Sequence, residues 1–200
     1  IEWCKENGID MIPGDGYLPA CVPAIVDTWA TVLARYGTMT FSQILSPAID
    51  LAENGFPVYP SLYDHLKANF QRYKNLYPTT GDVYMPDGNV PFIGEILRNP
   101  DYASVLRKMC DAERSAQGGR VAGIEAARDF FYTGDIAEQI VRYISDNPVE
   151  DSTGVAHKGL MSFDDISTWN ATVEPSVSST FRDLEVHKCS TWTQGPVFLQ

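Results

Sequence analysis

Hydrophobic positions near the start of the chain recur at the spacing of an amphipathic helix. Apolar residues three and four positions apart predict a helix over 22–36, with Pro23 in its first turn and Gly37 at its exit. Trp29 lies at the centre of this apolar stripe. We therefore expect Trp29 in the hydrophobic core, where its replacement by alanine would cost about 3–5 kcal/mol.

Proline and glycine divide the next stretch into shorter elements. The segment "TFSQILSPAIDLAENG" begins with a capping-box pattern at Thr40. Proline removes a backbone hydrogen bond from a continuous helix, so Pro47 predicts a second helix that starts there and ends at Gly55. A further helical pattern covers 62–73, and the Pro-Asp-Gly sequence at 86–88 predicts a turn that suits a small hairpin.

Three longer helices are predicted in the second half of the chain. Asn99 followed by Pro100 is typical of a helix start, and the apolar spacing extends this helix to about residue 117. Its expected inward side chains are those of Tyr102, Leu106, Met109 and Cys110. Two more helical patterns cover 120–131 and 135–146. The polar stretch "DNPVEDSTGVAHKG" that follows predicts a surface loop.

The periodicity changes near the end of the chain. Ser162 and Asp165 predict the capping of one more short helix. Beyond it the apolar positions alternate, which predicts two strands within 177–188 around a turn at Arg182 and Asp183. The predicted fold class is therefore α+β, mainly helical, with a C-terminal β-hairpin.

Composition narrows the class of protein. Hydrophobic residues make up 44% of the chain and aromatic residues 12%, which fits a globular chain and not a disordered one. A formal net charge of −11 repels phosphate backbones and argues against nucleic-acid binding. No apolar run approaches the roughly 20 residues that a membrane-spanning helix needs. None of these properties predicts a cellular location.

The cysteine and histidine positions predict no metal site. Cys4, Cys21, Cys110 and Cys189 lie far apart, so we expect free thiols that are mostly buried. His187 and Cys189 are two apart on a predicted strand and share a face. A zinc site requires further closely spaced ligands, so two neighbouring side chains on a strand are the simpler interpretation.

Other short motifs carry little chemistry. The sequence contains no phosphate-binding loop, dinucleotide fingerprint or G-x-S-x-G elbow, and "PGDGYL" suits a turn. Asp164 and Asp165 could act as an acid/base pair, but carboxylates at a helix start are favoured by the helix dipole. The triplet "NAT" at Asn170 matches a glycosylation sequon, a pattern that also arises by chance.

Several long segments of the chain carry motifs in a characteristic order. "VPAIVDTWATVLARYGTMTFSQILSPAIDLAENGFPV" is similar to V-P-G-x-V, R/K-Y-G and L-x-P-A-I-x-L-A-x-x-G-F-x-V in succession. "NPDYASVLRKMCD" and "ARDFFYTGDIAEQIV" are similar to P-x-L-A-x-T-L and F-Y-x-G-x-I-A-x-x-I. "GLMSFDDISTWNATVEPSVSSTFRDLEVHKC" is similar to G-x-[LM]-[ST]-x-x-D-L-x-x-Y and a short hairpin. In order and spacing, the motifs resemble those of the γ-glutamyltranspeptidase family over nearly the whole chain.

This resemblance implies both a fold and a reaction. Family members are longer precursors of the N-terminal-nucleophile hydrolase class, an αββα sandwich, and they cut themselves into a large and a small subunit. Residues 1–200 would form a single segment of the large subunit, incomplete at both ends, with the rest of the precursor as its partner. The arginine that binds the substrate carboxylate would precede Ile1, and the catalytic threonine would follow Gln200. We therefore expect no catalytic residue in this chain.

The chain departs from the family pattern in two places. Ala24 stands where the family commonly has glycine, and "CSTWTQGP" stands where it usually has a proline-rich stretch with Ser-Ser-Gly-Gly. Pro196 suits a helix start, whose unpaired N–H groups can hold a carboxylate beside donors from Thr193 and Gln194. The candidate substrate-binding residues are thus Thr193, Gln194 and Gly195. Alternatively, Thr193 or Gly195 only caps this helix.

Three functions follow from these observations. The resemblance implies an amide hydrolase and acyltransferase that cleaves γ-glutamyl amides, such as glutathione, through an N-terminal threonine acyl-enzyme and without a cofactor. The altered stretch near the C-terminus instead suits a family amidohydrolase or acylase that acts on another small-molecule amide. A non-enzymatic helical binding module fits the periodicity equally well, but it does not explain the ordered motifs.

Overall fold

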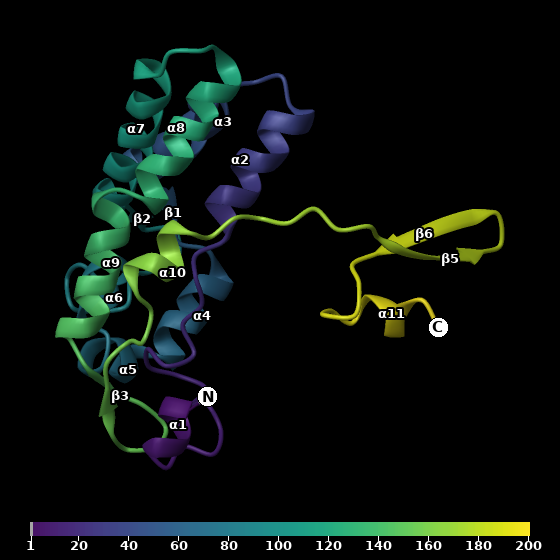
Figure 1. The fold of residues 1–200 in the computed structure, drawn as a ribbon. Coiled ribbons are helices and arrows are strands. Elements are labelled where there is room, and N and C mark those ends of the chain that lie inside the picture. The colour runs from purple at the N-terminus through teal and green to yellow at the C-terminus, as the bar shows by residue number, and fades with distance from the viewer. Residues whose placement is uncertain (1) are drawn as a thin grey trace. The chain divides into compact units, whose positions relative to one another are not determined.

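The computed structural model describes residues 2–200 and divides after Trp169 into two compact units. The helices of the first unit are α1 (Glu2–Glu6), α2 (Ile25–Tyr36), α3 (Phe41–Asn54), α4 (Pro60–Ala68), α5 (Phe70–Asn75), α6 (Pro78–Tyr84), α7 (Pro100–Ser115), α8 (Arg120–Tyr132), α9 (Asp135–Asp146) and α10 (Phe163–Ser167) (Figure 1). Its antiparallel strand pairs are β1 (Phe56–Pro57) with β2 (Ile96–Leu97), and β3 (Val149–Glu150) with β4 (Ala156–His157). The second unit contains β5 (Val177–Phe181), β6 (Leu184–Lys188) and α11 (Gly195–Phe198).

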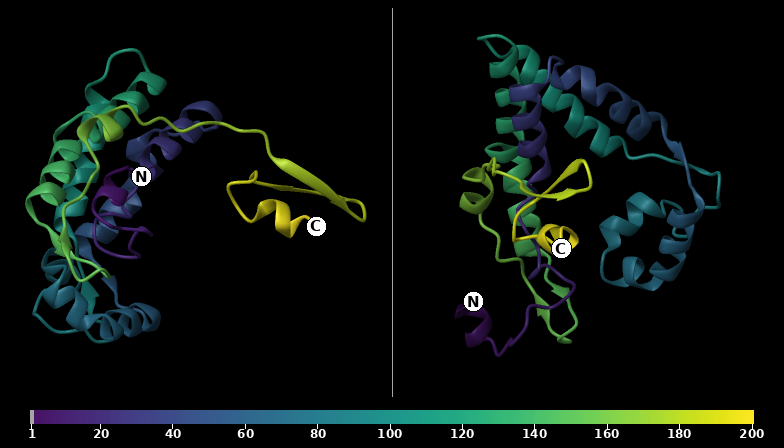
Figure 2. Two further views of the ribbon diagram at one scale, coloured as in Figure 1. Left: turned by 60° about the horizontal axis from the view of Figure 1, so that its bottom comes forward. Right: turned by 90° about the vertical axis from the view of Figure 1, so that its right-hand side faces the viewer.

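The α+β class is confirmed, with helices predominating. The hydrophobic core of the first unit lies among the long helices, where α7 packs between α3 and α8, and α2 and α9 pack on α8. Six residues in this core are completely buried: Phe41, Ile124, Ala127, Tyr132, Ala137 and Ile166. The short helices α4, α5 and α6 form a group of their own within the first unit (Figure 2). No helix in the described part of the chain is long and apolar enough to cross a bilayer.

A buried carboxylate joins α7 to the start of α3. Glu113, near the end of α7, accepts hydrogen bonds from the backbone N–H groups of Phe41 at 2.6 Å and Ser42 at 2.7 Å. It also accepts one from the Ser42 hydroxyl at 2.6 Å. The first N–H groups of a helix have no partner within the helix, and a negative charge there is favoured by the helix dipole. Glu113 thus satisfies the α3 N-terminus from a neighbouring helix.

The guanidinium of Arg120 binds the unpaired carbonyls at the end of α2. Arg120, the first residue of α8, donates hydrogen bonds to the backbone carbonyls of Leu33 at 3.0 Å and Ala34 at 3.1 Å. It also lies 3.3 Å from the carbonyl oxygen of Met39. The last carbonyls of a helix are unpaired and favour a positive charge. Glu113 on α7 therefore places a negative charge at the start of α3, and Arg120 on α8 places a positive charge at the end of α2.

A third polar cluster holds the start of α2 against α8. The completely buried Tyr132 accepts a hydrogen bond from the backbone N–H of Asp27 at 3.1 Å and donates one to the carbonyl of Pro23. Arg128 pairs with the Asp27 carboxylate and donates to the carbonyl of Trp169. Burial raises the pKa of the Tyr132 phenol, which keeps this hydroxyl a donor. The cluster ties α8 both to α2 and to the end of the first unit.

The prediction of two helices around Pro47 is wrong, because α3 runs through this proline as one helix. The apolar side chains on either side of Pro47, among them Leu45 and Ile49, are buried along a single stripe that packs on α7. Pro47 is exposed, and so is Gln43, whose carbonyl lacks the N–H donor that a proline cannot supply. Packing along the stripe outweighs the lost hydrogen bond.

The continuous helix predicted over 62–73 is also wrong, because the structure has two helices, α4 and α5, that meet at Asn69. The Asn69 side chain donates a hydrogen bond to the carbonyl of His65 at 2.9 Å. Asparagine competes in this way for backbone groups, which ends a helix. The sequence pattern also missed α1 and α6.

Two aromatic residues that were predicted to lie in the core are exposed. Trp29 has an exposed fraction of 41% and Tyr102 one of 47%. On α2 the side that packs inward carries Val26, Ala30 and Leu33, which are all buried. Trp29 belongs to a second apolar stripe on another side of the same helix, and the periodicity alone did not separate the two.

The remaining helix and hairpin predictions agree with the structure within a few residues. The Asn99 side chain caps α7, capping boxes begin α3 and α10, and β5 pairs antiparallel with β6 around Arg182. The turn at 86–88 is present, with Gly88 at a positive φ of 73°. It does not join two strands, because β2 pairs with β1 instead.

Replacing Glu113 by alanine is expected to destabilise the first unit by about 2–3 kcal/mol, because the buried N–H of Phe41 loses a charged partner. The free energy of unfolding in urea measures this effect. Glu125→Ala serves as the control, because Glu125 is exposed on the neighbouring helix α8. Equal stability of the two variants would contradict the assigned role of Glu113.

Candidate functional site

The predicted substrate-binding residues lie in the second unit, between β6 and the end of the chain. This unit consists of the β5–β6 hairpin followed by α11, a single turn that begins at Gly195. Lys188 at the end of β6 places its ammonium 4.3 Å from the centre of the Phe198 ring, which attaches α11 to the hairpin. Trp192 donates its indole N–H to Glu174 at 2.8 Å. The stretch from 189 to 195 is thereby anchored on both sides.

Thr193 is occupied in holding the loop together. Its hydroxyl lies 3.0 Å from the carbonyl of Ser190 and 3.3 Å from that of Cys189. The same oxygen accepts a hydrogen bond from the backbone N–H of Gly195 at 3.0 Å. A hydroxyl has one donor, and here it is directed at backbone carbonyls. These contacts support the capping alternative for Thr193.

Gly195 is buried and sits where no side chain fits. A Cβ atom at this position would lie 2.3 Å from the carbonyl oxygen of Cys189 and 2.9 Å from Cβ of Lys188. Such contacts require the backbone to shift, so glycine permits the close approach of α11 to the end of β6. Gly195 thus has a structural role in the loop geometry.

Gln194 differs from its two neighbours. Its backbone is the N-cap of α11 and its carbonyl accepts a hydrogen bond from Phe198 at 3.0 Å, but its side chain caps nothing. The residue is exposed, and its amide group makes no hydrogen bond to any residue from 2 to 200. Among the three predicted residues, Gln194 alone retains a side-chain donor and acceptor for a ligand.

The other sequence motifs take structural positions. Asp165 accepts hydrogen bonds from the backbone N–H and hydroxyl of Ser162, and these bonds hold the pKa of its carboxyl below the ordinary value. Asp165 is therefore the partner in a capping box and does not suit an acid/base pair with Asp164. His187 lies 3.0 Å from the Ser176 hydroxyl. Within 2–200, no cluster of three metal-ligating side chains occurs.

The cysteines are free thiols in the structure, as predicted, but their expected burial is wrong for two of them. Only Cys110 is buried, whereas Cys21 and Cys189 are exposed and Cys4 is half-buried. Cys110 lines a hollow of about 300 Å³ between α3 and α7. The charged groups around this hollow already have partners: Arg107 pairs with Glu53, Arg114 pairs with Asp111, and Asp50 accepts a hydrogen bond from Asn54. Because these groups are already paired, the hollow is a poor ligand site.

A polar cluster that the sequence did not reveal joins the "PGDGYL" loop to two distant segments. Asp15 accepts hydrogen bonds from Arg72 at 3.0 Å and from the backbone N–H of Ser152 at 2.8 Å. The backbone N–H of Gly16 donates to the Tyr77 hydroxyl at 2.9 Å. The partners are separated by more than fifty positions, so no local motif indicated them. The loop is a turn, as predicted, and the hydrogen bonds of Asp15 and Gly16 hold it against these two segments.

Beside this cluster the buried Asp151 pairs with the half-buried His157. The carboxylate of Asp151 contacts Nδ1 of His157 at 2.8 Å and accepts hydrogen bonds from the N–H and hydroxyl of Thr153 at 2.9 and 2.6 Å. Burial would raise the pKa of Asp151, but the hydrogen bonds from Thr153 and His157 outweigh it and hold the pKa below the ordinary value. The rings of Trp3 and His157 meet nearly at right angles, with ring centres 5.9 Å apart.

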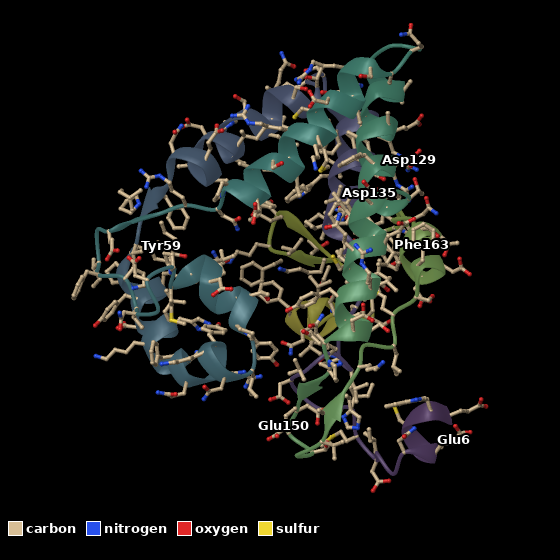
Figure 3. The ribbon with its side chains drawn as sticks, turned by 90° about the vertical axis from the view of Figure 1, so that its left-hand side faces the viewer. Glu6, Tyr59, Asp129, Asp135, Glu150 and Phe163 are labelled. Carbon is tan, nitrogen blue, oxygen red and sulfur yellow. The ribbon has the colours of Figure 1, made fainter. Side chains whose placement is uncertain are left out.

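Acidic side chains are prominent on the first unit. Asp129 and Asp135 lie near the junction of α8 and α9, and Glu150 lies on β3 (Figure 3). A surface of this sign agrees with the formal net charge of −11 and favours partners that are neutral or basic.

Comparisons with known proteins identify the fold and its class. The family model described as gamma-glutamyltranspeptidase matches residues 3–200. The solved structure of LmbA2991HD is similar with a TM-score of 0.92 and 34% identity, over 98% of this chain and 33% of that one. A cephalosporin acylase from Bacillus halodurans is similar with a TM-score of 0.74 and 26% identity, over 93% of this chain and 31% of that one.

A curated relative gives the same result from sequence. The glutathione hydrolase-like YwrD proenzyme of Bacillus subtilis is 29% identical over 174 residues, which cover 87% of this chain and 28% of the relative. The chain belongs to the gamma-glutamyltranspeptidase family. It spans about a quarter to a third of the length of these relatives.

The Asp151–His157 pair predicts a specific pH dependence of stability. The unfolded chain loses the hydrogen bonds that lower the pKa of Asp151, so its carboxyl protonates first as the pH falls below about 4. The free energy of unfolding therefore falls with pH in this range, until the folded carboxyl protonates too. Asp151→Asn is expected to be less stable at neutral pH. Its free energy of unfolding should also fall less steeply as the pH drops below about 4.

Urea unfolding at a series of pH values measures this dependence. Asp10→Asn is the matched control, because Asp10 is exposed. If Asp151→Asn lost stability with falling pH as steeply as the unsubstituted protein does, the carboxyl of Asp151 would not be the source of this pH dependence.

Proposed function

We propose that residues 1–200 belong to the large-subunit region of a γ-glutamyltranspeptidase-like amide hydrolase and acyltransferase. The observation that carries this proposal is the match of the family model to residues 3–200. A relative named as a glutathione hydrolase-like proenzyme, similar over 87% of this chain, supports it. The family match also favours an enzyme over a non-enzymatic helical module, since the periodicity of the helices would fit either.

The proposed reaction uses a nucleophile outside this chain. An N-terminal threonine, freed when the precursor cuts itself, attacks the amide carbonyl with its hydroxyl, and its own α-amine accepts the proton. The pKa of an α-amine is about 7.7–8.0, so this group is a competent base near neutral pH. Backbone N–H groups stabilise the oxyanion, the amine leaves, and water or an amino acid takes the acyl group. This sequence of steps requires no cofactor.

Gln194 is the residue through which this chain would contact the substrate. Its side-chain amide is exposed and uncommitted, whereas Thr193 and Gly195 maintain the backbone that presents it. An amide group can donate to a substrate carboxylate or accept from a substrate amine. We therefore assign substrate contact to Gln194 and give Thr193 and Gly195 a supporting role.

The acyl group of the substrate has two candidate classes. A γ-glutamyl amide such as glutathione is the first, in line with the relative named as a glutathione hydrolase-like proenzyme. An amide of another acyl group is the second, and two observations support it. The chain is similar to a cephalosporin acylase, and "TWTQGP" replaces the Ser-Ser-Gly-Gly stretch usual in the family.

The full-length precursor is expected to cut itself and then to release an aniline from a γ-glutamyl anilide or from an anilide of another acyl group. Absorbance measures the release, and gel electrophoresis measures the self-cleavage. A precursor that folds and cuts itself, yet turns over none of these amides, would contradict the proposed activity. The ratio of kcat/KM between the two kinds of anilide decides the substrate class.

Gln194→Ala in the full-length protein is expected to change that ratio while self-cleavage and Tm stay nearly unchanged. The reason is that the exposed amide makes no hydrogen bond within 2–200, so its loss removes no contact of the fold. Thr193→Val is the contrasting variant, because it removes the cap on the N–H of Gly195 and should lower Tm. A parallel fall of all activities and of Tm in Gln194→Ala would show that Gln194 is structural.

A further inference from the structure

An apolar hollow of about 310 Å³ opens in the first unit among α3, α6, the start of α7 and the β1–β2 pair. Its volume lies at the lower end of the roughly 300–1,000 Å³ that small-molecule sites occupy. We call it the Arg98 hollow, after the charged residue in its wall. A small ligand with an apolar body suits such walls, whose apolar side chains are those of Ala48, Leu51, Ala52, Phe56, Val83 and Leu97.

The guanidinium of Arg98 keeps two nitrogen atoms for a ligand. Its Nε donates a hydrogen bond to the carbonyl of Asn54 at 3.1 Å. Its two η nitrogens make no hydrogen bond or ion pair with any residue from 2 to 200. Arg107, which lines the hollow beside Cys110, differs because it pairs with Glu53. The planar N–H groups of a guanidinium match the two oxygens of a carboxylate, so Arg98 retains the donors that bind this group.

The backbone around Arg98 holds its side chain in position. Arg98 directly follows β2, and the backbone N–H of the next residue, Asn99, donates to the carbonyl of Ala52 at 2.7 Å. Gly55 after α3 has a φ of 93°, and a Cβ atom there would lie 2.9 Å from Cγ of Arg98. Glycine at this position therefore lets the arginine stem lie close to the backbone. A side chain already held in this way loses less conformational entropy when a ligand binds.

Two tyrosines supply further polar groups in the same hollow. Tyr84 comes from α6 and Tyr102 from α7, and both are partly exposed. Neither hydroxyl makes a hydrogen bond within the described part of the chain, residues 2–200. A phenol can donate to a carboxylate oxygen that the guanidinium leaves unpaired. Mostly apolar walls with a few polar groups are typical of small-molecule sites.

The charges favour one class of occupant. The chain has a formal net charge of −11, so an anion binds only where a local cation attracts it. A neutral apolar molecule would bury the edge of Arg98 without a partner, and a small inorganic anion would gain nothing from the apolar walls. We propose that the Arg98 hollow binds a small monocarboxylate with an apolar body, such as a medium-chain fatty acid, with its carboxylate on Arg98. This site is separate from Gln194 and does not depend on the proposed function.

Isothermal titration of the full-length precursor with sodium octanoate tests this proposal. Octanoate is expected to bind with a Kd of about 1 mM or below, since a ligand of this size gains a few tenths of a kcal/mol or more per atom. Octanol, which has the same body without the charge, and acetate, which has the charge without the body, should each bind at least about tenfold more weakly. Absence of octanoate binding, or equal binding of octanol, would overturn the proposal.

Substitution of Arg98 tests the carboxylate contact. Arg98→Gln is expected to weaken octanoate binding at least about tenfold, because the charged partner is lost. Arg98→Lys keeps the charge and should restore part of the affinity. Arg107→Gln is the matched control, because it removes an exposed arginine that already has Glu53 as its partner. Equal loss in the two glutamine variants would indicate a general effect of charge and overturn the proposal.

A pair of variants at Leu51 tests the location without touching Arg98. Leu51 lines the hollow with an exposed fraction of 52%, so polar replacements there should leave Tm nearly unchanged. Leu51→Glu places a like charge beside the bound carboxylate and is expected to weaken octanoate binding at least about tenfold relative to Leu51→Gln. Equal affinity of these two variants would place octanoate elsewhere in the protein and overturn the proposal.

These readouts are separate from catalysis. A precursor that binds octanoate through Arg98 but hydrolyses no amide would refute the proposed function and leave the carboxylate site established. An active enzyme whose octanoate affinity is the same with arginine or glutamine at position 98 would refute the carboxylate site alone.

Discussion

The carboxylate of Glu113 is the contact on which the arrangement of the long helices depends. It is buried at the first turn of α3 and joins residues that are 72 positions apart. A buried carboxylate must be hydrogen-bonded, and the N–H groups of Phe41 and Ser42 provide the required donors. Sliding α3 along α7 would leave the charge and both donors unpaired, so the polar contact selects one register for an apolar interface that alone would tolerate several.

The same helix pair also determines which side of α2 faces inward. Arg120 binds the last carbonyls of α2, and Tyr132 and Arg128 hold its first turn. With both ends attached to α8, the helix cannot rotate about its axis to bury its larger aromatic side chain. Small and medium residues therefore pack in the core, and Trp29 stays on the open side. An interior anchored by polar contacts thus leaves one apolar side of α2 exposed.

In the candidate site, too, some residues maintain the backbone while the side chain of another stays exposed. Thr193 and Gly195 are used entirely by the backbone of their own loop, one as a cap and one to permit close approach. The exposed side chain of Gln194 between them makes no hydrogen bond to any residue from 2 to 200. A family that keeps one fold can change substrates at such a position, because specificity is then separated from stability. Membership of the gamma-glutamyltranspeptidase family does not by itself decide the acyl group, because one fold can carry different substrate sites.

The sequence by itself determined many of the features that depend on neighbours within a few positions, although it missed α1, α6 and the break at Asn69. The caps at Asn99 and Ser162, the helices α7 to α9, the β5–β6 hairpin and the ordered family motifs could all be read from local pattern. Only the tertiary structure decided that α3 continues through Pro47, that Trp29 faces outward, and that Asp151 pairs with His157. Each of these depends on packing or charge contributed by another element. Apolar periodicity marks a side of a helix as hydrophobic, but which hydrophobic side is buried depends on partners that lie far away in the chain.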